Sequence, residues 1–83
     1  MSNMDCYQEC LEPIIWEMVG SSDYRFNEIE VDDDVRLITL AVKDAHLARV
    51  IGKNGEVVKA LETIVKVLNG KYQQRAILKI VSY

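Results

Sequence analysis

The residues best suited to chemistry lie in one short stretch, 50–59, in which two glycines three apart bracket a lysine and an asparagine. Gly52 and Gly55 have no Cβ atom, so they can adopt positive φ angles and let another molecule approach the backbone. A helix is predicted to begin near Gly55, and the amide hydrogens and dipole of a helix start attract phosphate. Lys53 adds a positive charge, and Asn54 adds a donor and an acceptor. The stretch predicts a cradle for the phosphates of a single strand.

Two glycines three apart also occur in a tight turn between helices, so the spacing alone leaves a purely structural interpretation open. The charge distribution favours phosphate. Residues 1–42 hold ten acidic and two basic residues, a net charge of −8, whereas residues 43–83 hold eight basic and three acidic residues, a net charge of +5. A local basic patch is sufficient for nucleic acid, because charges beyond about 8–10 Å are screened at physiological salt.

Other reactive residues do not form the sets that catalysis or metal binding requires. Cys6 and Cys10 lie four apart, and with His46 they make three zinc ligands where a structural site needs four. The run 32–34 of three aspartates is predicted to be a solvated turn, because a magnesium site needs ligands from several segments. The sequence has no Ser/His/Asp group, no paired carboxylates beside a base and no Walker-type loop. We therefore expect no enzyme activity, no metal and no cofactor.

Length and hydropathy bound the class of protein. Eighty-three residues with 49% hydrophobic and 28% charged content are expected to form one globular domain. The longest apolar-rich run, 37–42, is too short to cross a bilayer, and the first residues lack the features of a secretory signal. We expect a cytoplasmic protein that does not bind a membrane.

Apolar periodicity and turn residues predict six elements. In chain order they are a helix over 4–19, strands over 25–31 and 35–42, a short helix over 45–51, a long helix after the glycine loop that ends at Asn69–Gly70, and a strand over 75–82. The two adjacent strands are expected to form an antiparallel hairpin in which 35–42 is better buried. Three strands and three helices can pack as two layers around one core.

Several residues refine this prediction. Ser2 or Asn3 is expected to cap the first helix, and Asp44 the short helix. Pro13 predicts either a kink in the first helix or a helix that begins only there. Trp16 is expected at the edge of the core, and an exposed contact is the alternative.

The order α-β-β-α-α-β, with the glycine loop between the second and third helices, matches the type II arrangement of the KH fold. The phrase Arg49-Val50-Ile51-Gly52-Lys53-Asn54-Gly55 resembles the GXXG signature of KH domains. In length and in this phrase the chain is similar to the small stand-alone bacterial KH proteins of the KhpA type. The resemblance covers nearly the whole chain. It implies an α+β fold, a single KH domain over 1–83 and a three-stranded sheet packed against three helices, with the GXXG loop at 52–55.

The resemblance also implies a role for each residue of the site. In KH domains the GXXG loop clamps about four nucleotides of a single strand. Phosphates would lie over the loop while unstacked bases enter an adjacent apolar groove, with weak sequence preference. The residues expected to contact RNA are the glycine pair Gly52 and Gly55, the tip residues Lys53 and Asn54, the groove residues Ile51 and Val58, and the flanking basic residues Arg49 and Lys59. Single-stranded RNA is the expected ligand, and single-stranded DNA is left open as a second one.

A lone KH domain without aromatic residues beside its loop is expected to bind weakly, and KH modules gain affinity by acting in multiples. KhpA-like proteins are associated with self-association and with a second KH protein of the KhpB/Jag type. The resemblance therefore implies a homodimer, a heteromer of that kind, or both. Apolar residues left over on the predicted helices, Trp16, Ala60 or Val67, are the candidate contact residues. The implied role is that of a post-transcriptional regulator or RNA chaperone. Two alternatives remain, a KH-fold protein-interaction module, favoured by the acidic first half, and a ribosome-assembly factor.

Overall fold

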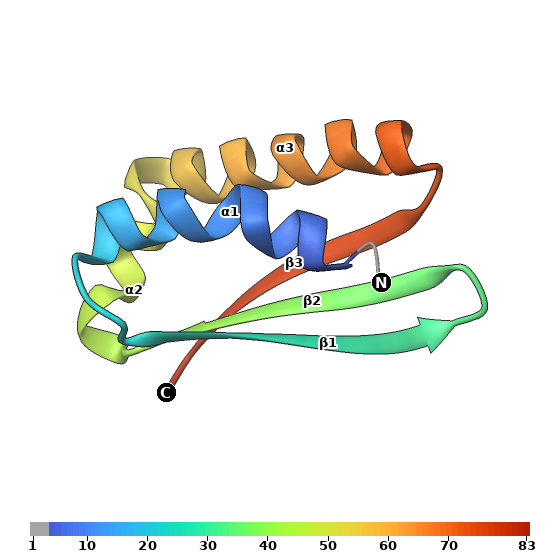
Figure 1. Cartoon of the computed structure of the whole chain (residues 1–83). Helices are drawn as coiled ribbons and strands as arrows, with labels where there is room; N and C mark the ends of the chain where they lie inside the picture. The colour runs from blue at the N-terminus through green and yellow to red at the C-terminus, as the bar shows by residue number, and fades with distance from the viewer. Residues whose placement is uncertain (1–3) are drawn as a thin grey trace.

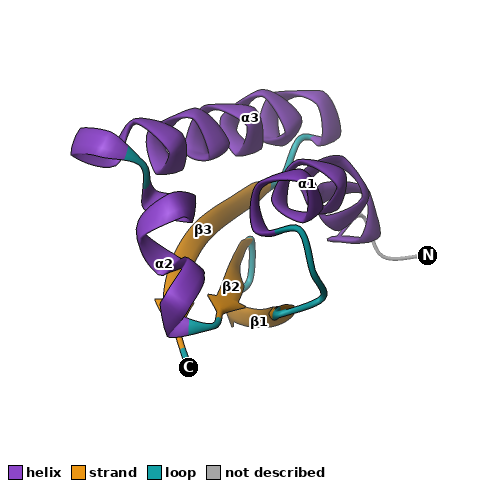
Figure 2. Ribbon diagram, turned by 90° about the vertical axis from the view of Figure 1, so that its left-hand side faces the viewer, coloured by secondary structure: helices purple, strands orange, loops and turns teal. Residues whose placement is uncertain are grey.

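The structure is a sheet whose helices all lie on one of its faces (Figure 1 and Figure 2). A computed structural model describes residues 4–83, with side chains from Tyr7 onward. The elements over these residues are α1 (Met4–Val19), β1 (Tyr24–Asp32), β2 (Val35–Val42), α2 (Asp44–Ile51), the 3-10 turn η1 (Lys53–Gly55), α3 (Glu56–Tyr72) and β3 (Arg75–Ser82). The predicted order of elements and the predicted two layers are confirmed.

The sheet has the strand order β1-β2-β3 and is mixed. Strands β1 and β2 form the predicted antiparallel hairpin, in which Tyr24 pairs with Val42, and β3 lies parallel to β2. A bulge between Glu30 and Asp32 adds one residue to β1 near the turn. As predicted, β2 is the better buried strand of the hairpin, because it lies between two neighbours and beneath the helices.

The core lies between the sheet and the helices. Strand residues alternate between the two faces, so every second residue of β2 and β3 faces the helices. Along α1 the buried residues recur four apart, which is one face of a helix. The core residues are Tyr7, Leu11, Ile15, Val19, Ile38, Leu40, Val42, Val50, Leu61, Val65, Leu68, Ala76 and Leu78. Trp16, predicted at the edge of the core, is instead 49% exposed. Its ring is edge-on to that of Tyr24, with ring centroids 6.5 Å apart, and Tyr24 is the residue that packs against the core.

Helix α1 runs without interruption from Met4 through Pro13, so the alternative in which it begins at Pro13 is wrong. A proline in a helix leaves the carbonyl four residues earlier without its usual partner. That carbonyl belongs to Glu9, and both Glu9 and Pro13 lie on the exposed side of α1, where water can satisfy it. A kink at this point stays a prediction, and Ser2 and Asn3, the predicted caps, lie outside the described residues.

Helix α3 continues past Asn69 and Gly70 to Tyr72, so the predicted stop is wrong. The Asn69 side chain, instead of ending the helix, accepts hydrogen bonds from the Tyr7 hydroxyl at 2.6 Å and the Ala76 amide at 3.0 Å. Gln73, with φ of 54°, takes the left-handed position that ends the helix.

The predicted cap of α2 is also wrong. Lys43 occupies the cap position, without a side-chain capping bond, and Asp44 lies in the first turn. The Asp44 amide donates to the Tyr83 carbonyl at 3.0 Å, which fixes the start of α2 to the end of β3. No helix within residues 4–83 is long and apolar enough to span a membrane.

Candidate nucleic-acid interface

The glycine loop between α2 and α3 turns through three residues with positive φ. Gly52 has φ 80° and ψ 169°, Asn54 has φ 57° and ψ 25°, and Gly55 has φ 72° and ψ 18°. The Gly52 conformation is essentially restricted to glycine, and a Cβ atom there would lie 2.8 Å from the backbone nitrogen of Val57. Asparagine is among the few other residues that adopt the left-handed region readily, which suits Asn54 to the tip.

The loop uses several of its own amides to hold this shape. The Gly52 amide donates to the Ala48 carbonyl at 2.9 Å, the Gly55 amide to the Gly52 carbonyl at 3.1 Å, and the Glu56 amide to the Lys53 carbonyl. These bonds fix the angle between α2 and α3 and make the loop a preorganised feature. Phosphate contact at the loop therefore depends on Lys53 and on amides other than these three.

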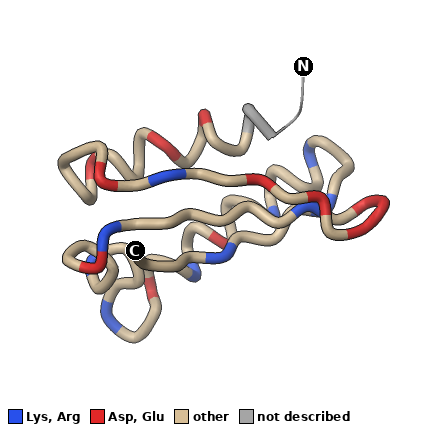
Figure 3. The backbone as a smooth tube through the Cα atoms, turned by 90° about the horizontal axis from the view of Figure 1, so that it is seen from below, with Lys and Arg blue, Asp and Glu red and all other residues tan. Residues whose placement is uncertain are grey.

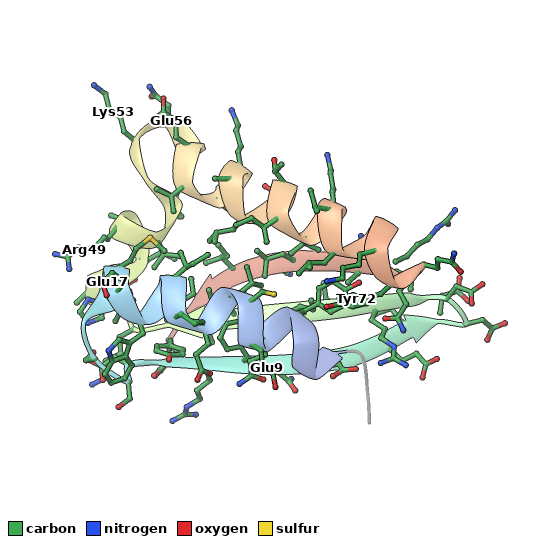
Figure 4. The ribbon with its side chains drawn as sticks, turned by 45° about the horizontal axis from the view of Figure 1, so that its top comes forward. Glu9, Glu17, Arg49, Lys53, Glu56 and Tyr72 are labelled. Atoms are coloured by element: carbon green, nitrogen blue, oxygen red, sulfur yellow. The ribbon has the colours of Figure 1, made fainter. Side chains whose placement is uncertain are left out.

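Two of the three predicted basic residues converge on the loop. Lys53 is exposed at its tip and projects outward beside Glu56 (Figure 4). Lys59 lies one turn into α3, and its side chain folds back so that a Cβ atom on Gly55 would be 4.0 Å from its Cε atom. Together these side chains place two ammonium groups around the loop, with Glu56 as the neighbouring acid.

Arg49, the third predicted basic residue, is exposed but directed elsewhere. Its guanidinium donates to the Met18 carbonyl at 3.1 Å, near the C-terminal end of α1. Figure 4 shows it projecting from α2 on a different side from Lys53. A cation suits a helix C-terminus, so one role of Arg49 is to join α2 to α1.

The apolar residues that flank the loop differ in burial. Val50 is fully buried and anchors α2 in the core, whereas Ile51 is 36% exposed and Val58 is half-buried. Val57 packs directly beneath Gly52. An apolar groove bounded by Ile51 and Val58 stays a prediction.

A hollow of about 720 Å³ lies elsewhere, between the β1–β2 turn and the end of α3. It is lined by residues of both charges, among them Asp33, Asp34, Arg36 and Arg75. Figure 1 shows the β1–β2 turn and the glycine loop at opposite ends of the molecule, so this hollow is no part of the loop.

The three consecutive aspartates of the first half do not lie near the loop. Three aspartates, 32–34, gather at the β1–β2 turn (Figure 3), at the end away from the loop in a molecule 34 Å long. At physiological salt, charges more than about 8 Å apart in solvent are largely screened. The acidic turn is therefore too distant to repel a strand at the loop.

A separate cluster of charged groups joins the start of β1 to the start of α2. The Asp23 carboxylate lies 3.4 Å from His46 Nε2 and 3.6 Å from Lys43 Nζ. A hydrogen bond from the Ser21 side chain, together with His46 and Lys43, holds the pKa of Asp23 below its ordinary value. This cluster is structural. Among the described residues, no group of three or more His, Cys, Asp or Glu side chains converges to hold a metal ion.

The predicted set omitted two residues of the site. Glu56 sets the local charge beside Lys53, and Val57 fixes the identity of Gly52. Both directly follow Gly55, in the first turn of α3. Their position next to the glycine pair is the feature of the sequence that could have identified them.

Comparison with known proteins agrees with this geometry. Residues 8–80 match the family described as KhpA/KhpB, KH domain. The chain is 36% identical over 78 residues to the RNA-binding protein KhpA of Aquifex aeolicus (strain VF5), and the match covers 93% of this chain and 98% of that protein. The α-β-β-α-α-β order, with the glycine loop between α2 and α3, is that of a type II KH domain. The chain belongs to the KhpA/KhpB family of KH domains.

Proposed function

We propose that this protein binds single-stranded RNA through the glycine loop and performs no catalysis. Phosphates lie against Lys53 and Lys59, and unstacked bases lie beside Ile51 and Val58. The observation that carries the proposal is the preorganised loop, in which glycine-specific backbone geometry presents one lysine at the tip while a second folds back toward Gly55. The relative from Aquifex aeolicus is named an RNA-binding protein, which supports RNA as the ligand.

The composition of the loop indicates weak binding with little base selection. A lysine ammonium is a point charge that contacts phosphate without reading a base. The described aromatic contacts lie between α1 and β1, beside Tyr83 after β3 and at the end of α3, and none involves a residue of the loop. We therefore infer that the protein acts as a cytoplasmic RNA chaperone or post-transcriptional regulator together with a partner. That partner is a second copy of this chain, a KhpB/Jag-type protein, or both, because linked sites raise avidity.

Fluorescence anisotropy of labelled single-stranded RNA tests the proposal. The Lys53→Asp/Asn54→Asp variant is expected to lose binding while its circular dichroism stays native, because aspartate also tolerates the left-handed region. The matched control is Lys71→Asp/Gln73→Asp, which makes the same charge change at the far end of α3, again with one residue at positive φ. The control is expected to bind like the native chain. Equal binding by all three proteins would move the RNA site away from the loop.

If the native protein binds no RNA at high micromolar concentration, the protein-interaction module becomes the leading account. The same assay with single-stranded DNA of matched sequence separates the two nucleic acids, because only RNA carries the 2′-hydroxyl group.

A further inference from the structure

The face of the sheet that points away from the helices, here called the outer face, carries an apolar row across all three strands. Ile38, Leu40 and Val42 point into the core, so the odd-numbered residues of β2 point outward, and their partners on β1 and β3 do the same. Ile29 pairs with Leu37, and Leu37 pairs with Ile77. Ile29 is 48% exposed and Ile77 is 55% exposed. A sheet face left to water is normally polar, so this row indicates an interaction surface.

The rows on either side of this apolar row place charges at the sheet edges. Toward the β1–β2 turn, Asp32 pairs with Val35, which pairs with Arg75. In the other direction the next row is Asn27, Thr39 and Lys79, and the row after that is Arg25, Ala41 and Val81. Arg25 is held over the ring of Tyr83, 4.9 Å from its centroid. In each of these three flanking rows, the residue on β1 therefore differs in charge from the residue on β3.

We propose that the outer face is the surface through which two copies of this chain associate. The two-fold axis lies between the two stacked sheets and is parallel to β2. Rotation about such an axis places β1 of one copy opposite β3 of the other at the same height along the strands. Ile29 then faces Ile77 of the second copy, and Leu37 faces itself, so the two apolar rows coincide. Stacked sheets lie about 10 Å apart and cross at about 30°, so the contact is best at these central rows.

Charge complementarity favours this axis. It places Asp32 of each copy opposite Arg75 of the other, and it places Lys79 opposite Asn27. One Asp32 carboxylate oxygen accepts a bond from the Asp33 amide at 2.8 Å, which leaves the second oxygen for a partner. An axis perpendicular to the strands would instead place Arg75 opposite Lys79, a like-charge contact that is unfavourable.

The size of the face predicts a weak dimer. Three strands of about eight residues span roughly 26 Å by 14 Å, or about 370 Å² for each copy, from the standard strand dimensions. A standard stable interface buries about 800 Å² on each partner. The dimer is therefore expected to form at micromolar concentrations and above. The inference rests on the self-association proposed above and leaves the RNA contact independent, because the glycine loop lies on the helical layer (Figure 2).

Charge reversal tests the geometry by sedimentation velocity from about 5 to about 500 µM, a range that covers a weak dimer. Asp32→Arg alone and Arg75→Asp alone each place like charges opposite one another, and each is expected to weaken the native dimer at least about tenfold. An equimolar mixture of the two variants is expected to restore the dimer, because both facing pairs are then of opposite charge. Two folded variants that stay monomeric when mixed would overturn the proposal, as would a native chain that stays monomeric throughout.

A second pair of variants makes the test independent of the β1–β2 turn. Ile77→Glu places a charge in the centre of the outer face and is expected to give a folded monomer that still binds RNA. Val67→Glu, the matched control, changes a residue on α3 that is 66% exposed, and it is expected to leave the dimer intact. A dimer lost in Val67→Glu and kept in Ile77→Glu would place the interface on α3. Loss of RNA binding in Ile77→Glu would assign the outer face to nucleic acid. Either result would overturn the proposal.

Discussion

Gly52 and Val57 are in such close contact that position 52 has no room for a side chain. A Cβ atom there would lie 2.8 Å from the Val57 backbone nitrogen, closer than such atoms approach in proteins. Because that contact is with backbone, a change of rotamer cannot relieve it. Gly52 is therefore required by packing as well as by its φ angle.

The two glycines of the loop are expected to differ in their tolerance of a methyl group. Gly52→Ala combines a glycine-specific conformation with a clash and is expected to lower the free energy of unfolding by roughly 2–4 kcal/mol. Gly55→Ala meets only ordinary contacts, the nearest at 3.8 Å from Val58, and is expected to cost about 1 kcal/mol from its positive φ. Urea denaturation of both variants measures the difference. Equal losses would mean that Val57 does not constrain position 52.

Asn69 joins α1, α3 and β3 through its side chain. It accepts from Tyr7 and Ala76 and donates to the Ala76 carbonyl at 3.1 Å. Asn69→Ala is expected to lower the free energy of unfolding by about 2–4 kcal/mol, and Tyr7→Phe by about 1 kcal/mol, since it removes one of these bonds. Tyr83→Phe, which removes a hydroxyl near the exposed end of β3, is the control and is expected to stay within about 0.5 kcal/mol of the native value. A Tyr7→Phe variant as stable as this control would show that the buried bond contributes nothing.

Gly70 and Gly20 differ in backbone conformation alone. Both have open space where a Cβ atom would lie, but Gly20 has φ of 71° and Gly70 lies within α3. Gly70→Ala is expected to raise the free energy of unfolding by about 0.5–1 kcal/mol, because alanine favours helix and restricts the unfolded chain. Gly20→Ala is expected to lower it by about 1 kcal/mol. Thermal unfolding followed by circular dichroism compares the two. A destabilised Gly70→Ala variant would contradict the extension of α3 to Tyr72.

Asp23 is expected to make stability depend on pH in the acid range. The pKa of Asp23 is lowered in the folded protein by Ser21, His46 and Lys43, so the folded state favours the carboxylate. That stabilisation is present above the ordinary carboxyl pKa of about 4 and is lost as the pH falls through the lower folded value. Asp23→Asn is expected to have a lower melting temperature than the native chain at pH 7. The difference should disappear near pH 2, and a difference that stays constant across this range would exclude the carboxylate as its source.

The sequence was sufficient wherever local patterns decide structure. The apolar spacing after Gly55 gave α3, the nearly unbroken apolar run over 35–42 gave β2, and the glycine spacing placed the loop between two helices. The end of α3 was misplaced because Asn69 is satisfied by Tyr7, which lies 62 residues away in the chain. The bond from Arg49 to the Met18 carbonyl was not foreseen for the same reason, since it spans 31 residues. A local pattern carries no information about such contacts.

The contribution of Lys53 to salt dependence tests the phosphate contact most directly. The measurement is the slope of the logarithm of the RNA association constant against the logarithm of salt concentration. Each phosphate contact of a single strand adds about 0.7 to the magnitude of that slope. Lys53→Gln is expected to bind more weakly with a slope smaller by about 0.7, while Lys71→Gln keeps the native slope. A Lys53→Gln variant with native affinity and native slope would contradict phosphate binding at the glycine loop.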